Sequence, residues 1–343
     1  MKAIIFEEHG SVEKLKYKEV SVPELGSGEV LVRVKACALN HLDIWTRQGL
    51  PGVTIPLPHI LGCDIAGVVE KLGAGVSNRF KKGDRVVVSP GQSCGQCDVC
   101  YKGLDSFCLK YKIMGFQVNG GYAQFAKTDE RHLIAVSDKH SFEEWAAAPL
   151  VFLTAWHMLI TRAQLKPGET VLIHAAGSGI GSAAIQIAKL VGARVLTTAG
   201  SKEKLQKAKK LGADIALNYK EEDFHKAAQK ENNGEGVDVV FEHIGPEVWE
   251  KSLASLRRGG RLVTCGATSG PKAEVNLRAL FMKHLQILGS YMGSRHELNS
   301  VLALIEQGKL SPVVDSTFPL KEAALAQQRM LDRKNFGKIV LVP

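Results

Sequence analysis

The pattern of hydrophobic and polar residues changes near Leu150. Before it, short runs rich in β-branched residues, such as Val30 to Val34 and Arg85 to Val88, alternate with glycine-containing turns. Runs of about four to eight such residues between glycines are typical of strands. The first 150 residues therefore predict an irregular, mostly antiparallel β-domain.

After Leu150, apolar strands alternate with helical segments of about ten residues that end before glycines. This alternation indicates βαβ units and a parallel sheet covered by helices on both faces. The expected strands are Val171–His174, Arg194–Thr198, Val237–Phe241 and Arg261–Cys265, and the expected helices are Ile180–Val191 and Lys202–Leu211. The fold class is therefore α/β, with a doubly wound parallel sheet beside a mostly-β domain.

The C-terminal tail carries two more predicted helices, Glu297–Gln307 and Lys321–Asp332, and a closing strand, Lys338–Val342. We expect this tail to return to the first domain. Residues 1–151 and 291–343 then form a catalytic domain and residues 152–290 a dinucleotide-binding domain, with the ligand in the cleft between them.

Composition excludes several other classes of protein. Met1 to Gly10 contains no signal-peptide core, and the longest weakly polar stretch, Ala146 to Trp156, is far shorter than the roughly 20 residues of a membrane helix. The net charge is +9, but basic and acidic residues are interleaved, without an arginine-rich tract. These features predict a cytoplasmic enzyme that binds neither membranes nor nucleic acid.

Four of the seven cysteines lie within fifteen residues, as C-x2-C-x2-C-x7-C. Two-residue spacers allow thiolates to converge on one ion, and four thiolates complete a tetrahedral shell with no open position. An iron–sulfur cluster and two disulfides are the alternatives. We predict one structural zinc per chain, in a lobe spanning about residues 90–110, on Cys94, Cys97, Cys100 and Cys108.

A small-residue turn follows the strand that ends at His174 and opens directly into a helix. Small residues let the backbone approach a pyrophosphate, whose charge then lies at the helix N-terminus. In the G-x-G-x-x-G pattern, Ala176 and Ser178 occupy the first two glycine positions and Gly181 the third; a tight structural turn is the alternative. The residues expected to bind a dinucleotide here are Ala176, Gly177, Ser178, Gly179, Ile180 and Gly181.

The end of the second strand bears on the choice of cofactor. An acidic residue there would bind the ribose hydroxyls of NAD, but the chain reads Thr198-Ala199-Gly200-Ser201 and then three charged residues of a helix. Ser201 can donate a hydrogen bond, and Lys204 a positive charge, to a 2′-phosphate. Ser201 is also a suitable N-cap. We therefore favour NADP(H) over NAD(H).

With these motifs, the chain resembles the medium-chain dehydrogenase/reductase superfamily, which contains zinc alcohol dehydrogenases and quinone oxidoreductases. The resemblance extends over nearly the whole length. It is carried by GEVLVRVKA, GCDIAGVV, the cysteine lobe, the dinucleotide turn, GGRLVTCG and GKIVL. It implies a GroES-like catalytic domain, a Rossmann domain, a small-molecule substrate and a homodimer or homotetramer.

The chain differs from the alcohol dehydrogenases at the positions of their catalytic zinc ligands. The resemblance places Asn40 at the first ligand, Cys63 at the second and Leu150 at the third, while Leu42 stands at the proton-relay hydroxyl. This set does not retain the zinc, so we predict a centre without a catalytic metal. Asn40 is the expected polar group there, positioning the cofactor or a substrate carbonyl.

The resemblance also assigns further cofactor contacts. Lys204 and Tyr219 match residues that hold the 2′-phosphate in quinone reductases, although Tyr219 is also a plausible strand-end aromatic residue. The positions implied near the pyrophosphate or the nicotinamide are His41, Thr154, His243, Ile244, Cys265, Ser290 and Lys338. His59 and His157 are expected to be structural or supporting residues, and Cys37 and Cys265 small core residues.

Three functions remain open at the level of sequence. The leading hypothesis is an NADPH-dependent reductase of quinones or activated C=C bonds without a catalytic zinc. The second is an alcohol dehydrogenase with an unusual metal site on Cys63, Asp64, His41 or His59. The third is a binding protein that senses NADPH without turnover.

Overall fold

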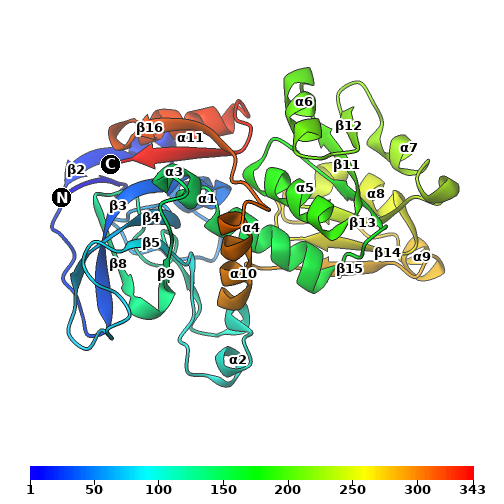
Figure 1. The fold of residues 1–343 in the computed structure, drawn as a ribbon. Coiled ribbons are helices and arrows are strands. Elements are labelled where there is room, and N and C mark those ends of the chain that lie inside the picture. Colours follow the sequence, from blue (N-terminus) through cyan, green and yellow to red (C-terminus); the bar gives the residue numbers. More distant parts are fainter. The chain divides into compact units, whose positions relative to one another are not determined.

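A computed structural model describes residues 1–343, and the chain divides into two compact units. One unit comprises Met1–Leu150 and Ser294–Pro343, and the other Val151–Gly293. Figure 1 labels the helices and strands of both units. No helix combines the length and the apolar content needed to cross a bilayer.

The first unit is built on a mostly antiparallel sheet in the order β16-β17-β3-β4-β5-β9, in which β8 also pairs with β3. Only β16 and β17 run parallel to each other. Its strands are β1 (Lys2–Ile5), β2 (Lys16–Glu19), β3 (Glu29–Ala38), β4 (Asp64–Leu72), β5 (Arg85–Val88), β6 (Gly91–Gln92), β7 (Lys112–Ile113), β8 (Phe125–Asp129), β9 (Leu133–Ala135), β16 (Val314–Pro319) and β17 (Lys338–Val342). Its helices are α1 (His41–Gln48), α2 (Asp98–Tyr101), α3 (Phe142–Ala146), α10 (Arg295–Glu306) and α11 (Ala323–Leu331).

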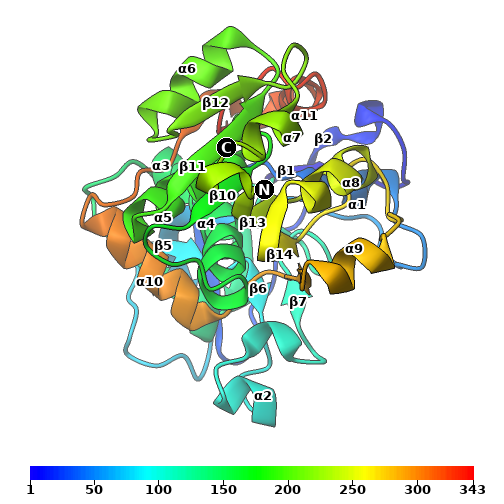
Figure 2. The same cartoon turned by 90° about the vertical axis from the view of Figure 1, so that its right-hand side faces the viewer.

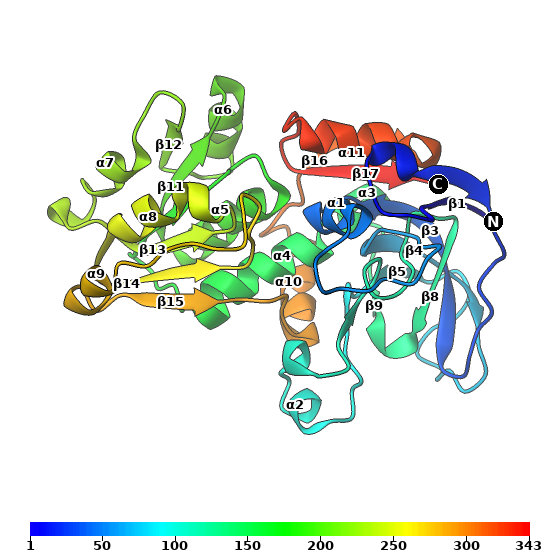
Figure 3. The same cartoon turned by 180° about the vertical axis from the view of Figure 1, so that it is seen from behind.

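Strand β3 shows why this half folds as a sheet. Its sequence alternates, so that Val32 and Val34 are buried while Arg33 and Lys35 face solvent. The closing strand β17 pairs with β3 through Val340 and Leu341, and the C-terminal tail therefore belongs to this unit. Figure 3 shows β16, α11 and β17, in red, beside the N-terminal strands in blue.

The second unit is a six-stranded parallel sheet in the order β12-β11-β10-β13-β14-β15. Its strands are β10 (Thr170–Ile173), β11 (Arg194–Ala199), β12 (Ile215–Asn218), β13 (Val237–Glu242), β14 (Leu256–Thr264) and β15 (Gln286–Gly289). Its helices are α4 (Pro149–Trp156, beginning at the boundary and continued by a π-helix over His157–Arg162), α5 (Gly179–Val191), α6 (Lys202–Lys210), α7 (Phe224–Ala228), α8 (Pro246–Ala254) and α9 (Leu277–Met282). These elements confirm the predicted α/β class.

The central strands β10 and β13 are buried along their whole length, as expected where helices cover both faces of a parallel sheet. Helices α5 and α8 lie on opposite faces, which Figure 2 shows. The strand order reverses between β10 and β13, so the carboxyl ends of these neighbours flank a topological switch point. Open parallel sheets bind their ligands at such a point.

Candidate active site and zinc lobe

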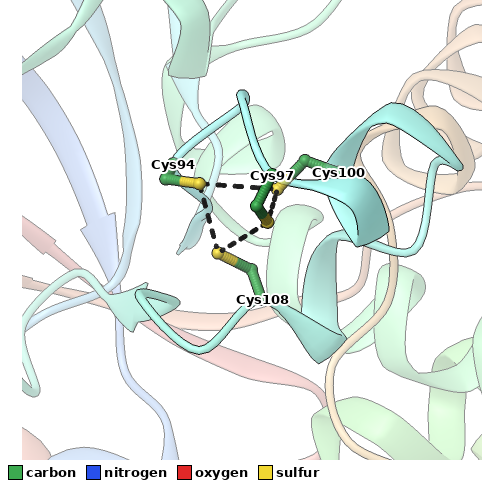
Figure 4. A group of neighbouring side chains, drawn as sticks. All are labelled: Cys94, Cys97, Cys100 and Cys108. Carbon is green, nitrogen blue, oxygen red and sulfur yellow. Dashed lines mark hydrogen bonds between the residues drawn. The ribbon is translucent and has the colours of Figure 1, made fainter.

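The four clustered cysteines converge around a common centre, shown in Figure 4. Their Sγ–Sγ separations include 3.4 Å for Cys97–Cys100, 3.6 Å for Cys94–Cys108 and 3.9 Å for Cys94–Cys100. A tetrahedron with a zinc–sulfur distance of about 2.3 Å has sulfur–sulfur edges of about 3.8 Å. The four thiols therefore fit a zinc ion, and four sulfurs complete its shell.

The thiols of this lobe differ in acidity: the backbone N–H of Cys100 lowers the pKa of Cys97, but the neighbouring sulfurs raise it to about 11. The backbone N–H of Gln96 is the main cause that lowers the pKa of Cys94, which falls to about 6. The Arg131 guanidinium donates to the backbone carbonyl of Cys94 at 2.7 Å and is held by Asp129 at 2.8 Å. A positive charge beside four thiolates offsets part of the negative charge of a zinc–tetrathiolate site.

The turn between β10 and α5 is shaped for close backbone approach. Ala175 adopts a left-handed conformation, and the hydroxyl of Ser178 accepts from the N–H of Gly181 at 2.9 Å as the N-cap of α5. A Cβ on Gly181 would lie 2.4 Å from the carbonyl oxygen of Ala175, so only glycine fits there. The first N–H groups of α5, on Gly179 and Ile180, have no acceptor within the helix, as a pyrophosphate site requires.

At the end of β11, the aromatic ring of Tyr219 covers Gly200. A Cβ on Gly200 would lie 2.7 Å from the Tyr219 hydroxyl, and about half of the tyrosine side chain remains exposed. Ser201 caps α6 by accepting from the N–H of Lys204 at 3.4 Å. The nearest carboxylate along the chain, Glu203, forms an ion pair with Lys207 at 2.7 Å. Ser201 and Lys204 thus follow the end of β11, and Tyr219 follows the end of the neighbouring parallel strand β12.

Three neighbouring strand ends carry the residues assigned to the nicotinamide. The buried Glu242 carboxylate, at the end of β13, accepts from the N–H groups of Ile244 and Gly245 at 2.5 and 2.6 Å and from the Thr264 hydroxyl at 2.8 Å. His243 Nε2 lies 3.2 Å from the carbonyl oxygen of His174, so this nitrogen carries a proton. Burial lowers the pKa of His243 and keeps its ring neutral.

Cys265 follows β14, and Ser290 follows β15. Burial and the Glu242 charge raise the pKa of the Cys265 thiol to about 12, which makes it unreactive. The hydroxyl of Ser290 is buried without a hydrogen-bond partner. An unpaired buried hydroxyl at a strand end fits a polar group of a bound cofactor.

In the first unit, Asn40, Cys63, Asp64 and Lys338 form a closed, buried cluster. Lys338 Nζ donates to Asn40 Oδ1 at 2.6 Å and to Asp64 Oδ2 at 2.9 Å. Asn40 Nδ2 donates to Asp64 Oδ2 at 2.8 Å and to Cys63 Sγ at 3.2 Å. The N–H of Leu150 donates to the second Asp64 oxygen at 2.8 Å.

This cluster is balanced in charge and nearly complete in hydrogen bonds. The side chains of Lys338 and Asp64 are 4% and 0% exposed, so the ion pair is fully desolvated. Both N–H donors of the Asn40 amide are used within the chain, which leaves an acceptor lone pair and no free donor. Burial raises the pKa of Cys63 well above its usual range, so Cys63 is a thiol here.

The residues proposed for an alternative metal site do not converge. In the chain, only the four lobe cysteines bring three or more His, Cys, Asp or Glu donor atoms within 4.8 Å of one another. His59 Nε2 is bonded to the carbonyl of Gly115 at 3.1 Å, and His41 is exposed on α1 with its ring against Trp45.

Sequence reasoning did not identify Asp43, which lies one turn into α1 and is 1% exposed. Its carboxylate accepts from the N–H groups of Asn40 and Gly62 and from the Tyr122 hydroxyl, at 2.8, 3.1 and 3.0 Å. Burial is the main cause that raises the pKa of Asp43 to about 6. The N-x-x-D spacing from Asn40, a capping-box pattern, was the available signal.

The other residues that the sequence assigned a role are buried or lie in a turn of their own unit. Thr154 and His157 are buried on α4 and its continuation, and Cys37 is buried on β3. Ile244 begins the turn that the Glu242 carboxylate holds.

Comparison with known proteins places these features in context. Residues 26–138 match the alcohol dehydrogenase GroES-like domain, and residues 179–307 match the zinc-binding dehydrogenase family. Among curated relatives, an alcohol dehydrogenase of Geobacillus stearothermophilus is 35% identical, covering 99% of both chains. A quinone oxidoreductase of Rattus norvegicus is 32% identical over 100% of this chain and 98% of its own. A crotonyl-CoA reductase of Streptomyces avermitilis is 34% identical over 95% and 82%.

Solved structures give the same picture. An NAD-dependent alcohol dehydrogenase superposes with a TM-score of 0.96 at 44% identity, covering 100% of both chains. A 2-octenoyl-CoA carboxylase reductase in complex with NADP and 2-octenoyl-CoA superposes with a TM-score of 0.91 at 30% identity, over 99% of this chain and 87% of its own.

Proposed function

The chain belongs to the medium-chain dehydrogenase/reductase superfamily, and from that premise we propose that this oxidoreductase reduces quinones or activated C=C bonds, such as enones and enoyl thioesters, with NADPH and without a catalytic metal. Relatives named quinone oxidoreductase and crotonyl-CoA reductase support this substrate class. A soluble homodimer or homotetramer in the cytoplasm is part of the proposal.

The observation that carries the proposal is the Asn40–Asp64–Lys338 cluster. Hydride transfer from an alcohol requires its alkoxide, which a Lewis acid makes accessible near neutral pH. In this chain the Lys338 ammonium is bonded to Asn40 and Asp64, and Cys63 is held as a buried thiol, which supports a centre without a Lewis acid. Reduction of an already electrophilic carbon needs no Lewis acid, because the developing charge spreads onto an oxygen that a hydrogen bond stabilises.

The residues of the second unit fit a phosphorylated dinucleotide. The bound nicotinamide would supply the hydride. The turn at Gly181 and the first N–H groups of α5 would hold the pyrophosphate, while Ser201, Lys204 and Tyr219 would hold the 2′-phosphate. The similar structure of a 2-octenoyl-CoA carboxylase reductase with bound NADP supports this assignment of the cofactor.

Within the cluster, the donors left for a substrate oxygen are few. Asn40 has no free N–H, so we assign it an acceptor and positioning role. Lys338 uses two of its three N–H groups on Asn40 and Asp64. Its third N–H and the weaker Cys63 S–H are the donors left in the cluster, and we propose that the Lys338 N–H stabilises the anionic oxygen formed by hydride addition. Solvent then supplies the proton.

An alcohol dehydrogenase is the second candidate, favoured by the similarity to proteins of that name. It requires a metal at Cys63 and Asp64, whose donor atoms are taken up by Asn40, Lys338 and Leu150 in this structure.

A substrate panel distinguishes these functions. Purified protein is incubated with NADPH or NADH and with quinones, enals, enoyl thioesters, aldehydes and ketones, and with NADP⁺ or NAD⁺ and simple alcohols. The proposal predicts turnover of quinones or activated alkenes and negligible alcohol oxidation. Efficient alcohol oxidation that is lost on metal removal would replace it by the second candidate, and no turnover at all would favour the NADPH-sensing protein.

A further inference from the structure

A second buried polar network lies behind the Asn40 cluster and connects three segments that are distant in sequence. It contains Asp43 and Arg47 of α1, Tyr122 from the segment before β8, and Gln327 of α11. All four side chains are essentially excluded from solvent, with exposures of 0–1%. Such burial of ionisable groups is costly unless they are hydrogen-bonded and balanced in charge.

The buried Arg47 guanidinium has only neutral hydrogen-bond partners. No carboxylate lies within 4 Å of the Arg47 guanidinium; instead its Nε donates to Gln327 Oε1 at 2.8 Å, and a second nitrogen donates to the carbonyl of Gly10. The Gln327 side chain also lies beside Tyr122, whose hydroxyl donates to Asp43, while Gln327 Nε2 is buried without a hydrogen-bond partner. Two neutral side chains therefore lie between the buried arginine and the buried aspartate.

Asp43 joins the two chain segments that carry the reaction centre. One oxygen accepts from the N–H of Asn40, and the other accepts from the N–H of Gly62, directly before Cys63 and Asp64. Gly62 itself has no room to move: a Cβ there would lie 2.4 Å from the Tyr122 ring and 2.6 Å from Cys37 Sγ. The Asp43 carboxylate thus joins the backbone of Asn40 to that of Gly62, in addition to the bonds that the Asn40 side chain itself makes to Cys63 and Asp64.

We propose that Asp43 is the positioning residue of the reaction centre, and that the Tyr122 hydroxyl holds its carboxylate in place. This inference rests on the proposed function only in taking the Asn40 cluster as the reaction centre. The carboxylate sets where the Asn40 amide and the Lys338 ammonium lie. It does not touch the substrate.

The test compares three variants of the full-length protein. Asp43→Asn keeps the size of the side chain but replaces one carboxylate oxygen by an NH₂ group. This group faces a hydrogen-bond donor and cannot accept from it. Tyr122→Phe removes only the hydroxyl and leaves the ring against Gly62. Asp84→Asn is the matched control, because Asp84 also accepts from a backbone N–H, that of Lys81 at 2.9 Å, before β5 in the same unit.

A displacement of the reacting groups by about 1 Å lowers the rate roughly a hundredfold. We therefore expect kcat to fall about 10- to 100-fold in Asp43→Asn and about 3- to 10-fold in Tyr122→Phe. The dissociation constant of NADPH, measured by its fluorescence, should stay within about twofold of the wild type, because the expected cofactor residues lie mainly in the second unit. The kinetic isotope effect with 4-deuterated NADPH should increase, since hydride transfer becomes slower. Asp84→Asn should change neither kcat nor the isotope effect.

An Asp43→Asn protein with wild-type kcat and isotope effect would overturn the inference. If that variant does not fold, Tyr122→Phe decides: a kcat at least about threefold below wild type supports it, and an unchanged kcat overturns it. The measurement uses whichever substrate the wild type turns over. Exclusive alcohol oxidation would therefore refute the proposed function while leaving the role of Asp43 open to the same comparison.

Discussion

Lys338 is the residue on which the buried Asn40–Asp64 cluster depends most strongly, because its ammonium is the only cation bonded to Asp64. Removing one partner of a buried ion pair typically costs about 3–5 kcal/mol, since the other charge remains buried without compensation. We expect Lys338→Met to lower the free energy of unfolding by about this amount in urea denaturation. The double variant with Asp64→Asn should recover part of it.

The surface pair Lys139–Glu306, at 3.3 Å, provides the control for Lys338. Because both partners contact solvent, Lys139→Met should change stability by less than about 1 kcal/mol. Equal stability losses for the two lysine variants would show that the Lys338–Asp64 pair is not the desolvated interaction described here.

A substitution of Lys204 tests whether the protein prefers NADPH to NADH. If its ammonium binds the 2′-phosphate, Lys204→Ala should weaken NADPH binding by about 1–3 kcal/mol, the range of a charge-assisted hydrogen bond. NADH binding should barely change, and isothermal titration with both cofactors measures the difference. Lys207→Ala on the same helix, paired with Glu203, is the control. Equal losses for NADPH and NADH would argue against this role of Lys204.

At the scale of elements, the zinc lobe is stabilised from outside by Arg131. This residue reaches the Cys94 carbonyl, and its own carbonyl accepts from Arg295 at the start of α10. Outer groups of this kind typically change metal affinity about 10- to 100-fold. We expect Arg131→Gln to lower zinc affinity by this factor in a chelator competition assay. Arg79→Gln, which removes an arginine stacked on Phe80 in the same unit, should leave it unchanged.

Most elements were predictable from sequence because their signals are local. The alternation in β3, the small-residue turn before α5 and the two-residue cysteine spacers each specify one conformation. The predicted helix over Lys321–Asp332 was less accurate, since its first turn is a 3-10 turn over Leu320–Glu322 and α11 begins at Ala323.

The reaction centre could be predicted only in part, because its partners are distant in sequence. Asn40 and Lys338 are separated by 298 positions, and no spacing indicates that Lys338 Nζ bonds to the Asn40 side chain. The roles of Asp43, Tyr122 and Gln327 were hidden for the same reason. Burial of polar side chains depends on how strands pair, which the pattern of a single segment does not contain.

For the whole molecule, both units contain a buried neutral histidine. Burial lowers the pKa of His132 in the first unit to about 4 and that of His174 in the second to about 3, from an ordinary 6.5. Between pH 6.5 and these lowered pKa values, the unfolded chain therefore binds more protons at the two histidines than the folded chain does. These two histidines should leave stability unchanged above about pH 6.5 and lower it below that pH, by about 1–2 kcal/mol each near pH 5. Protonation of Asp43, whose pKa is raised to about 6, stabilises the folded chain in the same range and opposes part of this loss.

Urea denaturation at a series of pH values measures this dependence. A variant with both His132→Gln and His174→Gln should show a flatter decline between about pH 6.5 and 4. An unchanged slope in that variant would mean that other groups cause the acid sensitivity.

Metal content tests the central claim most directly, because the chain brings together one tetrathiolate site, while the Cys63 and Asp64 side chains are bonded to Asn40 and Lys338. Elemental analysis of protein purified with zinc in the medium should give about one zinc per chain, with quinone or alkene reduction unaffected by a chelator that is too weak to open the cysteine lobe. About two zinc ions per chain, with the second lost from Cys63 and Asp64 together with activity, would contradict the account.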